Sequence, residues 1–411
     1  MDIENKQVVI IGAGPSGAIA AALLHAQNID VLVIEKTLFP RFSIGESLLP
    51  ACMEVIERAG MMDAVMQGGF QNKDGAAFRK QGRYSQFHFH DKFSAGPSTT
   101  WQVKRGDFDK ILADSAQSQG VEIRYQSEVL ALEVQQERTL ITVKNHHGIQ
   151  YAIQAQYVLD ASGFGRILPK LLHLEKPSSF PIRKAIFTHI KDNICPLDSV
   201  HDRNKILVCV HPQHSDVWYW LIPFADGTCS LGVVAQAQFF AQSEVSNIDL
   251  IKRLVEQDPD LSQLLQQAQY PNPAGELCGY AANVKHLATD RYALLGNAGE
   301  FLDPVFSSGV TIAMKSAELI ADCVVRKMQG NDVDWQKEYA DPLMIGVNAF
   351  RTYVEGWYDG SFQDVIFHEP ANDKIKQMIC SILAGYAWDE SNPYVHKSQQ
   401  RLRTLAEIVR T

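Results

Sequence analysis

The chain has 411 residues, of which 46% are hydrophobic and 21% are charged, and its formal net charge is −9. This length and composition predict two or three packed units and exclude a disordered tail, a collagen-like fibre and a disulfide-rich mini-domain. Phosphates would repel the excess of acidic groups, so neither nucleic acid nor a membrane surface is expected as a partner.

The seven cysteines are scattered along the chain without a C-x-x-C pair. Their odd number and their spacing argue against a disulfide framework and a structural zinc site, and they fit a reducing compartment. No run approaches about 18 apolar residues, so no membrane span is expected. The acidic N-terminus lacks the pattern of a secretory signal. We therefore expect a cytoplasmic enzyme without a metal ion.

Hydrophobic periodicity predicts a β-α-β start, with a strand over residues 8–11, a helix over 18–27 and a strand over 31–34. Alternation over 84–90 predicts another strand. A helix over 108–119, a strand over 121–125, strands over 206–235 and a helical C-terminal region from Val310 follow, with breaks expected at Pro342, Gly346, Gly356, Gly360 and Pro370.

The first turn of this β-α-β unit reads G-x-G-x-x-G, from Gly12 to Gly17. Gly12 permits a tight turn, Gly14 lets the backbone approach a pyrophosphate, and Gly17 lets helix and strand pack closely. The helix start offers free N–H groups to phosphates. Glu35, at the end of the second strand, is placed to bind a ribose hydroxyl. This pattern predicts a dinucleotide site but does not separate FAD from NAD.

Three further segments decide between the two cofactors. Arg105 lies in a V-x-R-x-x-F-D helix start, Asp160 begins a D-A-S-G turn, and a strand ending at Leu295 is followed by Gly296 and Asn297. These segments resemble FAD-dependent aromatic monooxygenases and favour FAD, although Asn297 replaces the Asp of that family's G-D-A. The sequence contains no second G-x-G-x-x-G, so a separate NAD(P)H-binding fold is not expected.

Four motifs narrow the family further. Residues 218–223 read W-x-W-x-I-P, residues 301–309 read F-x-x-P-x-x-S-x-G, residues 45–50 contain G-E-S, and Lys73 lies in a K-x-G-x-x-F setting. These motifs resemble those of flavin-dependent halogenases, which have an essential lysine at the position of Lys73. The resemblance covers about residues 6–325. The chain looks most like the family members that halogenate pyrroles or phenols. Many of these enzymes accept the ring only when it is attached to a carrier protein.

The resemblance implies a role for each motif. Lys73 would activate hypohalous acid, the amides of Ser308 and Gly309 would hold the halide, and Phe306 would line the substrate side. In a strand, Trp218 and Trp220 share one face, so they would form a wall between flavin and substrate. The residues expected to bind FAD are Gly12, Gly14, Ser16, Gly17, Glu35, Lys36, Arg41, Ser47, Arg105, Asp160, Gly296, Asn297, Gly309 and Val310.

The expected fold is α/β, with a Rossmann-like FAD-binding domain of the aromatic hydroxylase type, an antiparallel-sheet substrate domain and a helical C-terminal appendage. The FAD-binding domain would comprise residues 1–83, 100–175 and 280–330. The sheet domain would comprise 84–99 and 176–279, and the appendage, 331–411, would cover the substrate site.

The predicted activity is halogenation with FADH2 from a separate flavin reductase, O2, and chloride or bromide. The expected substrate is a pyrrole or phenol attached to an acyl or peptidyl carrier protein. One alternative is an aromatic hydroxylase, in which Lys73 would be dispensable. Another is a non-catalytic flavin-binding interaction protein. The assisting general base stays open, with Glu300 and Glu355 as candidates by residue type.

Overall fold

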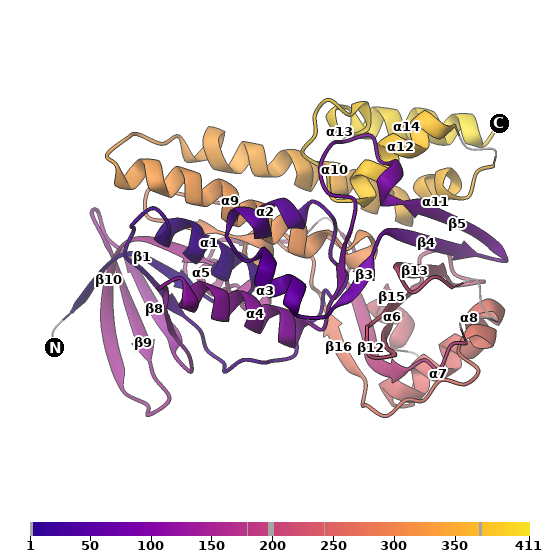
Figure 1. Ribbon diagram of the computed structural model, residues 1–411, viewed down its shortest axis with the longest axis horizontal. Coiled ribbons are helices and arrows are strands. Elements are labelled where there is room, and N and C mark those ends of the chain that lie inside the picture. The colour runs from indigo at the N-terminus through magenta and orange to yellow at the C-terminus, as the bar shows by residue number, and fades with distance from the viewer. Residues whose placement is uncertain (1–2, 179, 196–200, 242, 370–371) are drawn as a thin grey trace.

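The computed structural model describes residues 3–178, 180–195, 201–241, 243–369 and 372–411. Two sheets and a set of helices make up the molecule (Figure 1). The first sheet lies at one end with the N-terminus, the second lies at the other, and the C-terminal helices lie above the second sheet. The expected α/β class with a helical C-terminal region is confirmed.

The first sheet has the strand order β7-β2-β1-β10-β9-β8, and β18 pairs with β10. β1 runs parallel to both β2 and β10, as expected of a β-α-β start. All of β2 and the last residues of β1 and β10 are buried, typical of a sheet covered on both faces. The strands are β1 (Glu4–Ile11), β2 (Val31–Ile34), β7 (Glu122–Arg124), β8 (Glu128–Val134), β9 (Thr139–Lys144), β10 (Gln150–Asp160) and β18 (Tyr292–Leu294).

Three helices pack together on this sheet: α1 (Pro15–His25), α4 (Arg105–Ser118) and α9 (Ser308–Met328). All three were expected: the first two with starts three residues later than observed, and the third with a start at Val310, two residues later. α1 begins earlier because Pro15 suits the first helical turn, where its missing N–H costs nothing. Helix α9 thus brings a segment near residue 310 next to the N-terminal helix, so the unit around the first sheet is assembled from distant parts of the chain.

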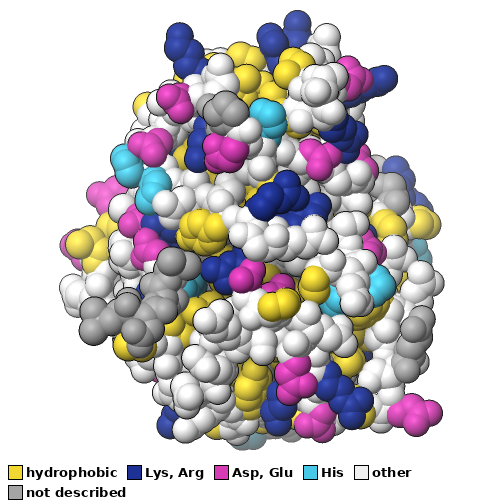
Figure 2. Space-filling model, turned by 90° about the vertical axis from the view of Figure 1, so that its right-hand side faces the viewer, with side chains coloured by type: hydrophobic (Ala, Val, Ile, Leu, Met, Phe, Trp, Pro, Cys, Tyr) yellow, Lys and Arg dark blue, Asp and Glu magenta, His cyan; other side chains and the backbone are white. Residues whose placement is uncertain are grey.

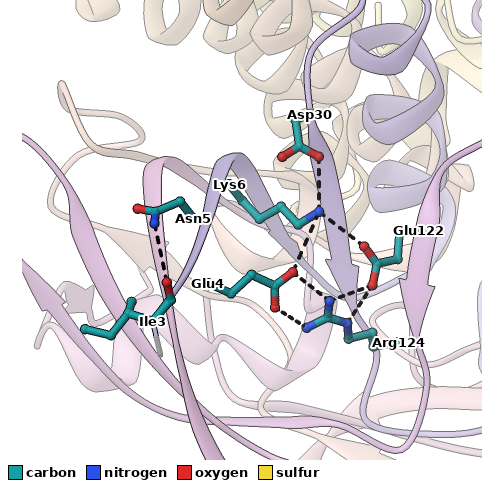
Figure 3. A network of polar contacts seen from close by, with 7 residues as sticks. All are labelled: Ile3, Glu4, Asn5, Lys6, Asp30, Glu122 and Arg124. Carbon is teal, nitrogen blue, oxygen red and sulfur yellow. Dashed lines mark hydrogen bonds and ion pairs between the residues drawn. The ribbon is translucent and has the colours of Figure 1, made fainter. Parts of the chain in front are cut away.

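An ion-pair network joins β1, β2 and β7 at one edge of the first sheet (Figure 3). Lys6 lies between Asp30 and Glu122, at 3.1 and 3.2 Å. Arg124 donates to both carboxylate oxygens of Glu4 at 2.7 Å. Hydrogen bonding to Arg124 lowers the pKa of Glu4. The network is partly exposed, so its effect is to fix strand neighbours rather than to add much stability.

The second sheet has the strand order β16-β12-β15-β14-β13-β4-β5. Its pairs are antiparallel except β4 with β13, which are parallel. Helix α7 (Asn247–Gln257) packs on β12, with α8 (Pro259–Leu264) beside it. The strands are β4 (Gly75–Lys80), β5 (Arg83–His88), β12 (Arg183–Lys191), β13 (Lys205–Val210), β14 (Trp218–Pro223), β15 (Thr228–Gln236) and β16 (Gly275–Cys278).

Smaller elements join the two sheets. β3 (Gln71–Lys73) pairs with β6 (Thr100–Gln102), and β11 (Glu175–Lys176) pairs with β17 (Asn283–Val284). β4 belongs to the second sheet, although the expected boundary at residue 83 would assign it to the FAD-binding unit. The domain limits themselves stay a prediction. The short helices are α2 (Cys52–Arg58), α3 (Met62–Gln67), α5 (Ile167–Leu171) and α6 (Ala237–Phe240).

The strand expected over 84–90 ends at His88, because Phe89–Asp91 turns into a 3-10 helix. Phe87 and Phe89 are both buried, whereas His90 is exposed. The predicted strand is therefore too long by two residues, although the burial of Phe87 and Phe89 still follows the alternation.

Two breaks expected in the C-terminal region are wrong. Gly346 and Gly356 lie inside one continuous helix, α10 (Asp341–Tyr358). A Cβ at Gly346 would approach the Trp388 ring to 2.2 Å, so this glycine serves close packing rather than helix termination. Pro342 lies in the first turn of α10, which directly follows a π-helical turn, Gly360 has a φ of +84° before the next helix, and Pro370 lies outside the described residues. The remaining helices are α11 (Ser361–Ile366), α12 (Asp373–Leu383), α13 (Pro393–His396) and α14 (Ser398–Val409), with a π-helical turn over Gln336–Ala340.

The face at the second-sheet end mixes charges of both signs, with Lys and Arg side chains over the C-terminal helices at its top (Figure 2). Within the described part of the chain, no helix is both long and apolar enough to cross a membrane. The seven cysteines are free.

Candidate functional site

A cavity of about 440 Å³ lies where the turn before α1, loop 41–47, the start of α4, β14 and the turn before α9 meet. These elements come from both sheets and from segments almost 300 residues apart. The lining includes thirteen of the residues proposed from the sequence: Gly12, Gly14, Ser16, Glu35, Lys36, Arg41, Ser47, Arg105, Trp218, Trp220, Asn297, Gly309 and Val310.

The turn before α1 has the close packing that its glycines predict. Gly12 has a φ of +99°, and a Cβ there would approach the Ala161 carbonyl oxygen to 2.6 Å. A Cβ at Gly17 would lie 1.9 Å from the Gly12 carbonyl oxygen, so Gly17 shapes the turn from behind the lining. No side chain caps α1. The helix start is therefore available to phosphates, as P-loop-like turns require.

Glu35 is fixed before any ligand binds. Its Oε2 accepts the Ala13 N–H at 2.8 Å, and its Oε1 accepts the Thr37 N–H at 2.9 Å. Both contacts orient the carboxylate at the cavity edge, where it can accept a ribose hydroxyl. Lys36 is exposed and pairs with Glu128 at 2.8 Å.

Two arginines share one buried carboxylate at the loop side of the cavity. Arg105 donates to Asp109 at 2.8 and 3.1 Å, and Arg41 lies 3.1 Å from the same side chain. Asp109 is fully buried. Two guanidinium groups against one carboxylate leave an excess positive charge, which suits a pyrophosphate.

Asp160 and Gly296 support the cavity without lining it. Asp160 is fully buried and accepts the N–H groups of Ser162 at 2.9 Å and Leu168 at 2.6 Å, and burial raises its pKa. Gly296 has a φ of +49°, and a Cβ there would approach the Ala313 Cβ to 2.7 Å. The structure therefore places both residues in the framework of the site.

The Trp218 and Trp220 rings form one wall of the cavity, with centroids 5.9 Å apart. The Trp220 Nε1–H donates to Ser230 Oγ at 3.0 Å, and the Trp218 Nε1–H donates to Tyr358 Oη at 2.9 Å. Gly232 makes room for this wall, because a Cβ there would lie 2.2 Å from the Trp220 ring. The shared face expected for these indoles is thus present on β14.

The turn before α9 has an unusual backbone. Ser307 has a φ of +57° and occupies the N-cap position without a side-chain capping hydrogen bond, Ser308 is buried, and Gly309 lines the cavity. Asp303 holds the turn by accepting the Val305 N–H at 3.1 Å and the hydroxyls of Tyr280 and Tyr358 at 3.1 and 2.8 Å. Burial raises the pKa of Asp303.

Lys73 lies outside the cavity lining and is fully buried at the end of β3. Its Nζ donates to the Leu48 carbonyl oxygen at 2.7 Å and lies 5.5 Å from the Phe89 ring centroid. Burial lowers the pKa of Lys73 to about 7. Since Leu48 follows the cavity residues Glu46 and Ser47 by one or two positions, the same loop reaches both the cavity and Lys73.

Phe306 is buried in an aromatic cluster and does not line the cavity. Its ring lies 5.9 Å from Trp357 and 5.3 Å from Phe362, both from the C-terminal region. Phe306 therefore joins the turn before α9 to the C-terminal helices through closed packing, and its place on the substrate side stays a prediction.

The candidate bases differ in burial. Glu300 is buried, pairs with Arg351 at 3.2 Å, and has its pKa raised by burial, whereas Glu355 is exposed. Sequence reasoning missed Glu46, which is buried in the cavity lining next to His189. Only its place inside the G-E-S motif could have singled it out. In the described part of the chain, no cluster of His, Cys, Asp or Glu is arranged for a metal ion.

The lining fits FAD. Three polar atoms of lining residues are buried without a hydrogen-bond partner in the described chain: Glu46 Oε2, Ser47 Oγ and Asn297 Oδ1. A ligand with many N–H, hydroxyl and carbonyl groups would satisfy such atoms. The glycine turn, Glu35 and the excess positive charge add sites for a ribose and a pyrophosphate.

Residues 5–331 match the family model described as "FAD binding domain". A 1H-pyrrole-2-carbonyl peptidyl-carrier-protein chlorinase from Pseudomonas fluorescens is 29% identical over 87% of this chain and 83% of its own length. The corresponding brominase from Pseudoalteromonas luteoviolacea is 28% identical over 80% of each chain.

The chain belongs to the flavin-dependent halogenases of this FAD binding domain family. The resemblance inferred from the motifs and the choice of FAD as cofactor are thereby confirmed. A crystal structure of a flavoprotein/dehydrogenase from Cytophaga hutchinsonii is 40% identical to this halogenase, covers 99% of both chains and superposes with a TM-score of 0.95.

Proposed function

We propose that this halogenase transfers a halogen to an electron-rich ring, a pyrrole or phenol on an acyl or peptidyl carrier protein, and that Lys73 activates the halogen. The observation that carries the proposal is the position of Lys73. It is fully buried, its Nζ donates to a backbone carbonyl, and the described residues place no carboxylate in ion-pair contact with it. A buried amine without a counter-ion costs stability, so a chemical role explains its presence.

Lys73 can act in two ways, because a pKa of about 7 populates both of its forms near neutral pH. The ammonium can donate a hydrogen bond to hypohalous acid and make its halogen more electrophilic. The neutral amine can take the halogen from hypohalous acid and release water, forming a haloamine. Either route keeps a reactive oxidant on a side chain away from solvent.

The other residues of the site have supporting roles. When bound and reduced, FAD supplies the electrons with which O2 and chloride or bromide are converted to hypohalous acid. The Trp218 and Trp220 wall keeps the ring substrate away from the cavity. The amides of Ser308 and Gly309, at the start of α9, would hold the halide. The proposed cofactor-binding set and domain limits remain those of the sequence analysis.

Two partners are part of the proposal. A carrier protein is supported by the chlorinase and brominase relatives, whose names state that they act on pyrrole-2-carbonyl groups on such proteins. A separate flavin reductase is supported by the single G-x-G-x-x-G of the chain. We place the reaction in the cytoplasm, since free cysteines persist in a reducing compartment.

Intact-mass measurement of a pyrrolyl carrier protein, incubated with the halogenase, FAD, NADH, a flavin reductase and either halide, tests this function. Gain of one or more halogen masses, with the free pyrrole acid unchanged, is expected. Halogenation of only the free ring would overturn tethering, and gain of oxygen in place of halogen would favour the hydroxylase.

A further inference from the structure

Glu46 is a buried carboxylate that has one partner too few. Its side chain is 1% exposed, and its Oε1 lies 2.7 Å from His189 Nε2. Its Oε2 is buried without a hydrogen-bond partner in the described chain. A carboxylate accepts hydrogen bonds at both oxygens, and leaving one unmade in the interior costs free energy. A donor that is not part of the described chain would remove this cost.

The backbone around Glu46 is held from several sides. The Arg105 Nη1–H donates to the Ile44 carbonyl oxygen at 2.7 Å, and the Val103 N–H donates to that of Glu46 at 2.7 Å. The Leu48 N–H donates to the Trp101 carbonyl oxygen at 3.1 Å. With His189 fixing one carboxylate oxygen, the second oxygen has a defined position.

The place of Glu46 points to one ligand. Glu46 lines the FAD cavity beside Ser47, and His189 extends from β12, whose Ala185 and Phe187 also line it. FAD offers hydrogen-bond donors in its ring imide and ribityl hydroxyls, and its reduced ring has a further N–H. We propose that Glu46 is a cofactor-positioning residue whose Oε2 accepts a hydrogen bond from bound FAD while His189 holds Oε1.

This proposal concerns FAD binding alone. The Glu46 contact can therefore be disproved while the proposed halogenation is upheld, and the halogenation can be disproved while the contact is upheld. Replacement of Glu46 by Met keeps a side chain of similar length but removes the acceptor. We expect Glu46→Met to weaken FAD binding about tenfold or more, as for other hydrogen bonds to charged groups. The cofactor-free variant should unfold at the same or a higher temperature than the wild type, because a buried carboxylate oxygen without a hydrogen-bond partner has gone.

The test is a fluorescence titration with oxidised FAD and an anaerobic absorbance titration with FADH2, together with thermal unfolding of the cofactor-free proteins. Glu46→Gln keeps an acceptor oxygen, so its loss of affinity should be smaller than that of Glu46→Met. Glu57→Gln, on the exposed side of α2, should bind as the wild type does. Equal weakening for both redox forms supports a contact with the imide or a hydroxyl. A larger effect on FADH2 supports a contact with the N–H of the reduced ring.

Two results would overturn the proposal. If Glu46→Met binds FAD and FADH2 within about twofold of the wild type, the free oxygen is satisfied by water. If the loss of affinity comes with a lower unfolding temperature of the cofactor-free protein, and Glu46→Gln shows both effects equally, Glu46 has a structural role only.

Discussion

Two lysines of this halogenase, Lys73 and Lys205, are fully buried, and they differ in the groups that surround their ammonium ends. Lys205 begins β13 and pairs with Asp74 and Asp202, at 2.9 and 2.5 Å. Lys73 ends β3 and donates to the Leu48 carbonyl oxygen. Asp74 directly follows Lys73 in the chain, yet its carboxylate contacts the other lysine.

The two environments move the pKa in opposite directions. Burial would lower the pKa of Lys205, but hydrogen bonds to Asp202 and Asp74 raise it above its ordinary value. Burial lowers the pKa of Lys73 to about 7. Lys205 is therefore a permanent cation that joins β13 to the segment before β4, whereas Lys73 can exchange a proton near neutral pH. The difference separates a structural lysine from a reactive one.

The largest expected effect is on catalysis. Lys73→Met removes the donor and the nucleophile but keeps a stem of similar length. Halogenation should fall by at least about 10³, which corresponds to roughly 4 kcal/mol of transition-state stabilisation. FAD affinity and flavin reoxidation should stay near wild type, because Lys73 lies outside the cavity lining. The measurement is halogenated product per flavin turnover.

Lys110→Met, on the exposed side of α4, is the control for this measurement and should retain wild-type activity. If Lys73→Met gave as much product per flavin turnover as the wild type, Lys73 would have no part in the mechanism. The reaction would then be better explained by direct attack on the ring.

The second effect is on the pH dependence of stability. The folded-state pKa of Lys73, about 7, lies below the ordinary 10.5, so unfolding takes up a proton between these values. The cost of burying Lys73 is therefore full below pH 7 and is relieved as the pH rises towards 10.5. Relative to Lys73→Met, the wild type should gain roughly 4 kcal/mol in free energy of unfolding across this range.

Urea unfolding of the two cofactor-free proteins at about pH 7 and about pH 9.5 measures about 3 kcal/mol of this gain. A difference between them that did not change with pH would mean that Lys73 keeps its proton in the folded state. In that case only the ammonium route to halogen activation would remain.

The third effect tests the structural lysine. Lys205→Met leaves Asp74 and Asp202 without their shared cation, but their side chains are 33% and 41% exposed and can be rehydrated. We expect a loss of about 1–3 kcal/mol in free energy of unfolding, below that of a fully buried broken pair. Chemical denaturation at neutral pH measures it. Unchanged stability would show that these ion pairs do no more than replace solvent.

The comparison also shows what could be predicted from the sequence. Lys73 was identified through its motif and not through its chemistry, because a single lysine in a sequence carries no sign of burial. The tight backbone of the glycine turn, the place of Glu35 after its strand and the shared face of the two tryptophans agree with the sequence analysis, because short-range spacing determines them. Their arrangement around one cavity was expected only from the family resemblance, since it depends on pairing between strands far apart in the chain.

The errors have a common physical cause. Gly346 and Gly356 were expected to break a helix, but they are needed where Trp388 and Leu402 approach the backbone. Helix propensity is a weak preference that such packing overrides. Glu46 was missed for a related reason, since an unpaired oxygen is visible only when every neighbouring residue is in place.

The smallest expected effect concerns the substrate side of the molecule, at the aromatic cluster of Phe306, Trp357 and Phe362. Phe306→Leu replaces a ring that packs edge-on against Trp357 and Phe362 with a smaller side chain. It should therefore leave space beside the turn that carries Ser308 and Gly309. Phe350→Leu makes the same change at another buried ring, which packs against Trp388 away from that turn. Each should cost about 1 kcal/mol in stability.

If Phe306 limits how the substrate lies, only Phe306→Leu should change the number or position of halogens added, as measured by mass spectrometry of the product. An equal change in both variants would assign the effect to loosened packing, and no change in either would place the substrate elsewhere.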